Sequence, residues 1–543
     1  MRSRSTPTHL LAVLAICLAA SLPFVSSVCN YFVNDDFGVV QLLSQKPPLY
    51  FPRWFVTSWM DNIWGAPQDE IRPFPAVTYQ LAAIWGATAP LANHVTNIAF
   101  HAANALLVLA IARGVAGMSF IASTYAALVF AVLPLHAESV AWITGRVDTI
   151  PALFFMGSFL AYARWRRGDA QSTRLYLCSL VLFFCALFSK QNTIVMVVTL
   201  FLYDLVAERR PIRATWSWLA PYVPFAALTV AYLLLRYMLF GEVAREGQLT
   251  ADGLGVTRIF LGKHFQRMFF GGEVARYPSG YIAALLLPAG AWFLMRSSGA
   301  ANLRHGPAMV LFFGPCWWFL CLAPLVVVGY ESTRHVYLAS VGWAIIVGMV
   351  LHALWHHRHA AIRNATLAAG AGLFFFYTVG LRAEVAEWNV RARVSQKVVA
   401  DLEREALAAA EGSLLIVGAP ARSWEWSLPF AAQPPFTRTD LADRVSIVSP
   451  VLLDCCRDQW AERTRRIVRT WSQRVSAPAV ALRWDARTGA YSRLSDREDP
   501  ALRSQVMALL QADTSEALDR AMLTILGRLD PLDGTLESGR TFR

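Results

Sequence analysis

Residues 119–163 read SFIASTYAALVFAVLPLHAESVAWITGRVDTIPALFFMGSFLAYA and contain two apolar runs joined by a short polar turn. The runs, residues 119–135 and 149–163, are each close to the length that crosses a bilayer as a helix. Ionisable side chains at membrane depth are costly unless they are paired or functional. The stretch therefore predicts a membrane hairpin with paired or functional charges at its tip. Four ionisable residues lie in this turn: His136, Glu138, Arg146 and Asp148.

The rest of the chain repeats the pattern of apolar runs and short polar loops. Of its 543 residues, 56% are hydrophobic and only 16% are charged, whereas soluble domains carry about 25% charged residues. This composition excludes a disordered chain, a repeat solenoid, a secreted disulfide scaffold and a nucleic-acid-binding domain. It predicts an all-α polytopic membrane protein. We expect eleven transmembrane helices, at residues 9–27, 93–112, 119–135, 149–163, 174–188, 191–206, 215–240, 281–295, 307–328, 336–354 and 364–381.

The distribution of charge predicts the orientation of these spans. The net charge is +12, and nearly all of the excess lies before residue 382. If residues 73–90, which three prolines interrupt, lie on the membrane surface, the basic residues concentrate in alternate loops. Basic loops remain in the cytoplasm. We therefore expect a cytoplasmic N-terminus, a first span (9–27) that is retained although it resembles a signal peptide, and a tail from about residue 382 on the outer side of the membrane.

The tail differs in composition from the membrane part and predicts a second domain. Strand-like runs at 413–420 and 444–450 and a hairpin-like run at 477–494 alternate with helical stretches near 390–411 and 500–528. We expect two domains: residues 1–385, a multi-pass membrane domain, and residues 386–543, a small soluble α/β domain in the periplasm.

Asp35 and Asp36 follow the first span by only a few residues. Two adjacent carboxylates at a membrane surface repel each other and lose hydration, which raises the pKa of at least one of them. The pair is therefore a candidate general base. The alternative is a solvated loop or a helix cap.

A second group of polar residues lies on one face of a predicted span. His94, Asn97 and His101 are spaced i, i+3 and i+7, so all three point in one direction on a helix. In a bilayer that face must turn toward the bundle interior or a wet cavity. The two interpretations are hydrogen bonding between helices and the lining of a site.

Basic residues on the predicted outer side complete the set of candidates. In the polar turn, Arg146 suits a phosphate contact oriented by Glu138 and Asp148, or alternatively a structural ion pair with one of these acids. Further candidates for binding an anionic lipid headgroup are Lys190, Arg236, Arg334 and His335.

With these residues placed, the chain resembles the GT-C class of polyprenyl-phosphate-sugar-dependent glycosyltransferases. It is most similar to the membrane domain of the tetratricopeptide-containing transmembrane O-mannosyltransferases and their bacterial relatives. The resemblance covers residues 28–395 and includes, in order, Asp35-Asp36, Trp64-Gly65, Arg72-Pro73, His94-x-x-Asn97-x-x-x-His101, His136-x-Glu138, Gly145-Arg146-x-Asp148, Ser189-Lys190, Tyr203-Asp204 and Arg334-x-x-Tyr337-Leu338-x-Ser340-x-Gly342. The chain departs from the family at Gln191, where an acid is frequent, and in lacking tetratricopeptide repeats.

The resemblance implies a function. It implies a first-loop acid, Asp35 or Asp36, as catalytic base, and inverting transfer of one sugar, such as mannose, from a polyprenyl-phosphate donor. The expected substrate-binding residues are Arg72, His94, Asn97, His101, His136, Glu138, Arg146, Asp148, Lys190, Arg236, Arg334 and His335. The expected setting is the inner membrane of a Gram-negative bacterium, with a periplasmic active site.

Partners and rival functions complete the expectation. The partners are the lipid-linked donor, the bilayer and a glycan, lipid or protein acceptor; nucleic acid is not expected. No cofactor is required, although an acid pair could hold a divalent metal. One alternative is an envelope-polysaccharide polymerase or ligase with a polyprenyl-diphosphate donor. The other is a transporter, whose charges would lie near the bilayer midplane.

Overall fold

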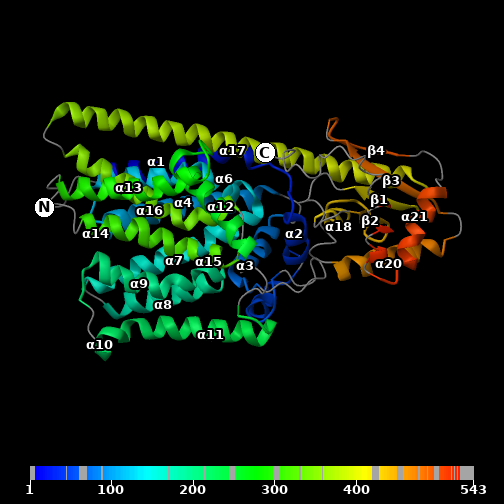
Figure 1. Ribbon diagram of the computed structural model, residues 1–543, viewed down its shortest axis with the longest axis horizontal. Coiled ribbons are helices and arrows are strands. Elements are labelled where there is room, and N and C mark those ends of the chain that lie inside the picture. The colour runs from blue at the N-terminus through cyan, green and yellow to red at the C-terminus, as the bar shows by residue number, and fades with distance from the viewer. Residues whose placement is uncertain are drawn as a thin grey trace.

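The protein forms a helical bundle with a small α/β domain at one end (Figure 1). The computed structural model describes residues 6–44, 46–59, 70–86, 90–168, 172–211, 215–243, 251–297, 306–328, 332–356, 359–418, 427–448, 457–474, 477–485, 487–494, 500–514, 516–518, 520–521 and 524–525.

The bundle helices lie side by side along the long axis of the molecule (Figure 1). They are α1 (Thr6–Ser21), α4 (Pro90–Gly114), α5 (Phe120–Ala131), α7 (Arg146–Arg166), α8 (Ser172–Leu187), α9 (Met196–Leu202), α10 (Trp216–Leu219), α11 (Val223–Phe240), α12 (Ala251–Phe270), α13 (Pro278–Ser297), α14 (Gly306–Leu311), α15 (Trp317–Val328), α16 (Tyr337–Trp355) and α17 (Ala360–Ala408). Three short helices lie toward the soluble domain: α2 (Asp36–Ser44), α3 (Pro73–Ala83) and α6 (Ala137–Ala141).

The expected multi-pass membrane fold is confirmed. Within the described residues, seven helices are long and apolar enough to cross a membrane, and an eighth is added if the pair bent by 53° at Pro134 is one span. This is fewer than the eleven expected spans, although every expected span contains helix. Residues 174–188 and 191–206 form shorter apolar helices, and α7 carries charges at both ends.

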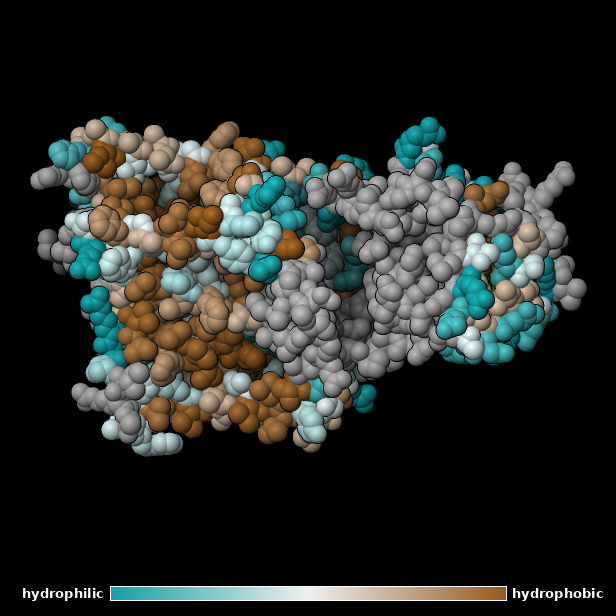
Figure 2. All heavy atoms as spheres, in the orientation of Figure 1, coloured by the Kyte–Doolittle hydropathy of each residue, from teal (hydrophilic) through white to brown (hydrophobic). Residues whose placement is uncertain are grey.

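The surface of the bundle is apolar, as contact with lipid requires. Figure 2 shows hydrophobic side chains over much of the visible face of the bundle. Large apolar side chains that are more than half exposed include Leu234 on α11, Phe293 on α13 and Phe375 on α17. Because this surface would be unfavourable in water, it supports a lipid-embedded bundle.

Residues 73–90 were expected on the membrane surface; within them Pro73–Ala83 form a helix too short to cross, and residues 87–89 lie outside the described part. Helix α3 has 11 residues and so rises about 16 Å, half of a hydrocarbon core. Proline at its first turn is favourable because the missing N–H would have no helical partner there. Tyr79 and Gln80 on this helix are buried against neighbouring segments.

The bundle end remote from the soluble domain is held by a buried carboxylate. Asp204 is fully buried, and its Oδ2 accepts hydrogen bonds from the hydroxyls of Tyr162 (2.8 Å) and Tyr222 (2.6 Å). Arg166 Nε donates to the same oxygen at 2.7 Å. The cluster joins α7 and Tyr222, the residue directly before α11, to the π-helical turn Tyr203–Ala207. This gives the Tyr203-Asp204 motif a structural role.

Replacing Asp204 with Ala is expected to destabilise the bundle. The change leaves the Arg166 guanidinium and two tyrosine hydroxyls without their shared acceptor, and breaking a buried ion pair costs about 3–5 kcal/mol. Thermal unfolding in detergent measures this effect. Glu516, exposed on the soluble domain, supplies a control as Glu516→Ala; equal unfolding temperatures for the two variants would contradict the structural role.

The soluble domain contains a four-stranded sheet in the order β2-β1-β3-β4. Strands β1 (Leu414–Gly418), β2 (Val445–Val448) and β3 (Ala479–Asp485) are parallel, and β4 (Ala490–Arg493) is antiparallel to β3. The predicted strands and hairpin are therefore confirmed, with residues 419–420 and 449–450 outside the described part. The helices are α18 (Leu428–Ala431), α20 (Arg457–Ser472) and α21 (Pro500–Gln511).

Two helices of this domain, α18 and α20, were not expected from the sequence. Helix α20 is rich in arginine, so its apolar stripe is narrow and hidden by a polar composition. Ile467, Val468 and Trp471 form that stripe and pack on one face of the sheet with residues of α21. The opposite face of the sheet packs against α17 and the first loop of the membrane domain.

Helix α17 connects the two domains. It has 49 residues and continues through residue 385, the expected boundary, into the soluble domain (Figure 1). Its length is therefore about 70 Å, more than twice the thickness of the hydrocarbon core. The soluble domain is thus joined to the bundle by a continuous helix.

Candidate active site

Most of the predicted site residues come together at the end of the bundle beside the soluble domain. The first loop, the turn between α5 and α7, the start of η5 (Gln191–Val195) and the 3-10 turn η9 (Thr333–Val336) all reach this end. The turn is tightly folded, because a Cβ at Gly145 would collide with the carbonyl oxygen of Glu138.

Asp36 is the anchored member of the acid pair. Its Oδ1 accepts hydrogen bonds from the Thr144 backbone N–H (2.9 Å) and hydroxyl (2.6 Å), and its Oδ2 accepts from the Val33 N–H (2.9 Å). Burial raises the pKa of this carboxyl to about 7 against these hydrogen bonds, and the charge of Asp35 adds to the rise. Asp36 thereby fixes the first loop to the turn.

Asp35 is the available member of the pair. The preceding Asn34 has φ +52°, a left-handed conformation that Asn tolerates better than most residues. The Asp35 carboxylate is partly exposed and makes no hydrogen bond within the described residues. Burial raises its pKa to about 6, opposed by the positive charges of Arg334 and Arg72. An available carboxylate with such a pKa suits a general base at neutral pH.

Arg334 is the central cation of the site. Its guanidinium lies 3.5 Å from a Glu138 carboxylate oxygen and 3.4 Å from an Asp148 oxygen, and it stacks 4.7 Å from the ring of Trp142. The Arg334 backbone N–H also donates to Glu138 at 3.2 Å. Two acids and an aromatic ring thus fix the direction of this side chain.

Lys190 extends the cationic group. Its ammonium donates to Asp148 Oδ1, and both side chains are largely buried. Burial lowers the pKa of Lys190 to about 8, Asp148 opposes that change, and the positive charges of Arg72 and Arg334 add to it. Arg72 and Arg334 therefore lie close enough to Lys190 for their charges to affect its pKa. Such a group of three cations suits the binding of an anionic group.

Arg72 reaches this group from the first loop. Its guanidinium pairs with Glu70 at 2.8 Å and lies 5.1 Å from the ring of Trp59. The side chain is about nine-tenths buried. Trp64 and Gly65, two residues of the family resemblance, lie outside the described residues.

Arg146 lies behind the site, and its donors are occupied by the protein. The fully buried guanidinium donates to Asn97 Oδ1 (2.9 Å), to Thr78 Oγ1 (3.0 Å) and to two oxygens of Asn93 (2.9 Å each). It also stacks 4.1 Å from the Tyr79 ring. Neither expected ion pair of Arg146, with Glu138 or with Asp148, is among the ion pairs of the described residues.

Three of the predicted histidines, His94, His101 and His136, make hydrogen bonds to other parts of the protein. His94 donates from Nε2 to the carbonyl of Asn30 at 3.2 Å, which ties α4 to the first loop. His101 donates to Ala131 O at 3.0 Å and shares a 2.8 Å hydrogen bond with the Tyr337 hydroxyl. His136 contacts Ser340 Oγ at 2.9 Å. All three are buried, and His101 and His136 bond helices to each other.

Asn97 and Arg236 also make protein contacts. Asn97 donates to the carbonyls of Trp142 (2.8 Å) and Ile143 (3.2 Å), so it holds the polar turn on α4. Arg236, near the end of α11, is buried and donates to Val243 O at 3.3 Å.

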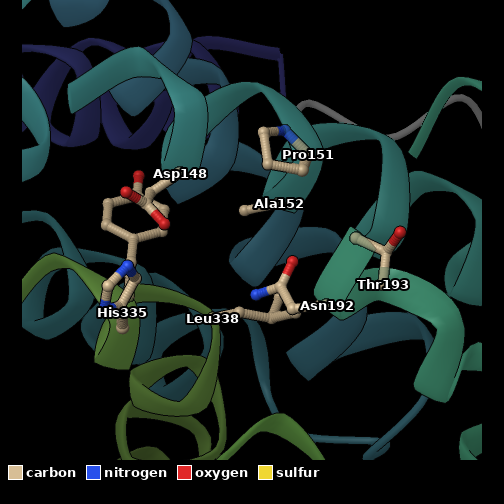
Figure 3. Close-up of a pocket in the computed structure, with 8 residues that line it drawn as sticks. Asp148, Pro151, Ala152, Asn192, Thr193, His335 and Leu338 are labelled. Atoms are coloured by element: carbon tan, nitrogen blue, oxygen red, sulfur yellow. The ribbon is translucent and has the colours of Figure 1, made fainter. Parts of the chain in front are cut away.

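A small pocket opens beside Asp148 and His335 (Figure 3). Asp148 and His335 lie together on one side of it, and Asn192 and Thr193 line the opposite part. Polar groups therefore continue from the cationic cluster into the interior. Within the described residues, no three His, Cys, Asp or Glu side chains are placed to hold a metal ion.

The sequence analysis missed Thr144 and Trp142 as functional positions. Thr144 supplies two of the three hydrogen bonds to Asp36. Trp142 donates from its indole N–H to Val33 O at 3.0 Å, and its ring supports Arg334. Their position in the charged turn was the only signal in the sequence.

Comparison with known proteins agrees with the resemblance. No family model matches the chain. It is 29% identical over 168 residues to the protein O-mannosyl-transferase TMTC3 of Mus musculus, covering 30% of this chain and 17% of that protein. It is 30% identical over 208 residues to TMTC1 of Homo sapiens, covering 34% of this chain and 23% of that protein. The matched part is thus less than a quarter of each of these two relatives.

Solved structures share the fold over most of the chain. The structure of ArnT from Cupriavidus metallidurans bound to undecaprenyl phosphate matches with a TM-score of 0.51 at 14% identity, over 88% of this chain and 93% of that chain. The oligosaccharyltransferase AglB from Archaeoglobus fulgidus, in complex with an inhibitory peptide and a dolichol-phosphate, matches at 0.53 and 13%, over 96% and 72%. The expected similarity to the O-mannosyl-transferases and the GT-C-like fold are both confirmed.

Proposed function

We propose that this chain is a membrane glycosyltransferase that transfers a single sugar from a polyprenyl-phosphate donor to an acceptor hydroxyl, with inversion at the anomeric carbon. Mannose is the first candidate, because the related proteins are named O-mannosyl-transferases. The observation that carries the proposal is that Arg72 and Arg334 lie near both Asp35 and Lys190, at one end of a glycosyltransferase fold.

The geometry supports a single displacement. The Asp35 carboxylate takes the proton of the acceptor hydroxyl while the acceptor oxygen bonds to the anomeric carbon. The bond between that carbon and the phosphate oxygen breaks, and its electron pair leaves with the polyprenyl phosphate. Arg334 and Lys190, with Arg72, stabilise the charge that develops on the departing phosphate. Asp36, His94, Asn97 and Arg146 hold the loop and turn that carry these groups.

The same proposal includes the orientation and partners. We place the N-terminus in the cytoplasm, and the site and soluble domain in the periplasm, of a bacterial inner membrane. The positive-inside distribution supports this orientation. Two structural neighbours were solved with undecaprenyl phosphate and with a dolichol-phosphate, which supports a lipid-linked donor. The acceptor is a glycan, lipid or protein hydroxyl.

The experiment that tests the function compares donors. Purified protein in lipid is supplied with a cell-envelope extract and labelled polyprenyl-phosphate mannose, other polyprenyl-phosphate sugars, or a polyprenyl-diphosphate glycan. We expect transfer from a monophosphate donor. Transfer only from the diphosphate donor would instead establish the polymerase or ligase. If no donor is used and sugar crosses sealed vesicles, the chain is a transporter.

The pH dependence of transfer follows from Asp35 and Lys190. Asp35 acts only when deprotonated, so activity rises as pH rises through its pKa of about 6. Lys190 binds phosphate only when protonated, so activity falls as pH rises through its pKa of about 8. The initial rate measured against pH is therefore expected to be bell-shaped. Lys190→Arg should move the alkaline limb upward, since guanidinium keeps its proton; an unmoved limb would exclude Lys190 as its cause.

A further inference from the structure

The soluble domain shares a hydrophobic core with the loop that carries the acid pair. Phe32, Phe37 and Leu43 of that loop are fully buried in one cluster with Leu402 of α17 and Leu428 of α18. The cluster thus contains residues of both domains. Such a continuous core predicts that the two parts move together.

Phe436 of the soluble domain makes the contact nearest the acid pair. Its ring lies 5.2 Å from that of Phe32 and 4.8 Å from that of Phe37, at interplanar angles of 72° and 80°. These edge-to-face contacts have the favourable geometry for aromatic pairs. Because Phe32 and Phe37 flank Asp35 and Asp36 in the sequence, Phe436 supports both sides of the acid pair.

Polar contacts fix the same interface. Gln41 of α2 donates to Gln433 Oε1 at 2.6 Å. Asn30 donates to Asn389 of α17 at 2.9 Å, and the Ser395 hydroxyl of α17 donates to the Phe32 carbonyl. The loop is therefore held from two sides: the membrane turn binds it through Thr144 and Trp142, and the soluble domain binds it through these groups.

We propose that the soluble domain is a positioning element of the active site, with Phe436 as the residue that holds the first loop so that Asp35 faces the cationic cluster. This inference rests on the proposed function. It gives the tail a role that requires no separate ligand: the Phe436 contacts act together with the apolar packing of α2 against α18 and with the side-chain hydrogen bonds to hold α2 on the tail.

Phe436→Ala in the full chain tests the proposal. A misplacement of about 1 Å can lower the rate by about 10²-fold, so we expect kcat to fall by about tenfold to hundredfold with the donor KM unchanged. A loosened loop also exposes Asp35 to water among its charged neighbours Arg72, Arg334, Glu70 and Asp36. The acid limb of the pH profile should then move to lower pH, and Phe436→Leu should restore part of both effects.

The control is Leu509→Ala, which opens a cavity in the other core of the soluble domain and touches no residue of the first loop. Hydrogen–deuterium exchange over residues 30–44 adds a readout that needs no activity. We expect faster exchange there in Phe436→Ala than in Leu509→Ala. Equal exchange in the two variants would overturn the proposal. In active protein, an equal kcat and an equal acid limb of the pH profile in the two variants would also overturn it. If Phe436→Ala exchanges faster than Leu509→Ala but the wild type uses no donor, the positioning of the first loop by the soluble domain stands and the proposed function is rejected.

Discussion

Asp35→Asn is expected to reduce sugar transfer by about 10²- to 10⁴-fold, the usual contribution of a general base. The amide has the size of the carboxyl but cannot take the acceptor proton. The Asp35 carboxylate makes no hydrogen bond within the described residues, so the change removes no structural contact there. We therefore expect unchanged or slightly higher thermal stability together with lost kcat, measured by steady-state transfer and by unfolding in detergent.

Asp36→Asn is the matched control for this prediction. Its carboxylate accepts three hydrogen bonds from Val33 and Thr144, and an amide nitrogen cannot accept one of them. Leaving a buried donor unsatisfied costs about 1–3 kcal/mol, so this variant should lose stability. If Asp36→Asn abolished transfer in a fully stable protein and Asp35→Asn remained active, the roles of the two acids would be reversed.

Arg334→Gln is expected to lower kcat by about 10²- to 10³-fold, comparable with the loss of one donor to a developing negative charge. The guanidinium is held by Glu138, Asp148 and the Trp142 ring, so it is oriented before the donor binds. Arg334→Lys keeps the charge but loses the planar fork and the stacking. We expect it to recover only part of the rate, and initial rates at saturating donor measure both effects.

Arg391→Gln is the control for Arg334. Arg391 also stacks on a tryptophan, 4.6 Å from the ring of Trp388, which in turn stacks on Trp142. No ion pair joins Arg391 to Glu138 or Asp148 among the described residues, so its loss should leave kcat nearly unchanged. Equal losses of kcat in both variants would show that the rate depends on the tryptophan stack and not on the Arg334 guanidinium beside Glu138 and Asp148.

The fold was largely predictable because lipid imposes a simple pattern. Apolar runs located the bundle helices except α12, which lies outside every expected span, and the alternating runs of the tail located the sheet. The number of full-length spans was not predictable, since the helices over residues 174–188 and 191–206 are short and α7 carries charges at both ends. Helix α20 was missed because its core-facing stripe is small.

The site was predictable in membership more than in geometry. The sequence placed Asp35, Lys190 and Arg334 at one end of the bundle, and in the structure Arg334 lies near both Asp35 and Lys190. The sequence could not indicate where a side chain points. Arg146 is of a residue type that suits a phosphate contact, yet its guanidinium points toward Asn93 and Asn97. The support of the loop by Phe436 depends on a contact across some four hundred residues of sequence, and no local pattern contains it.

The most direct test of the account is a single-turnover measurement with the protein in excess over polyprenyl-phosphate mannose and acceptor extract present. The account predicts that the wild type releases polyprenyl phosphate in step with sugar transfer, and that Asp35→Asn binds the donor but releases almost none. Release by Asp35→Asn at the wild-type rate would contradict base catalysis by the first loop. Absence of release from every monophosphate donor in folded wild type would contradict the glycosyltransferase itself.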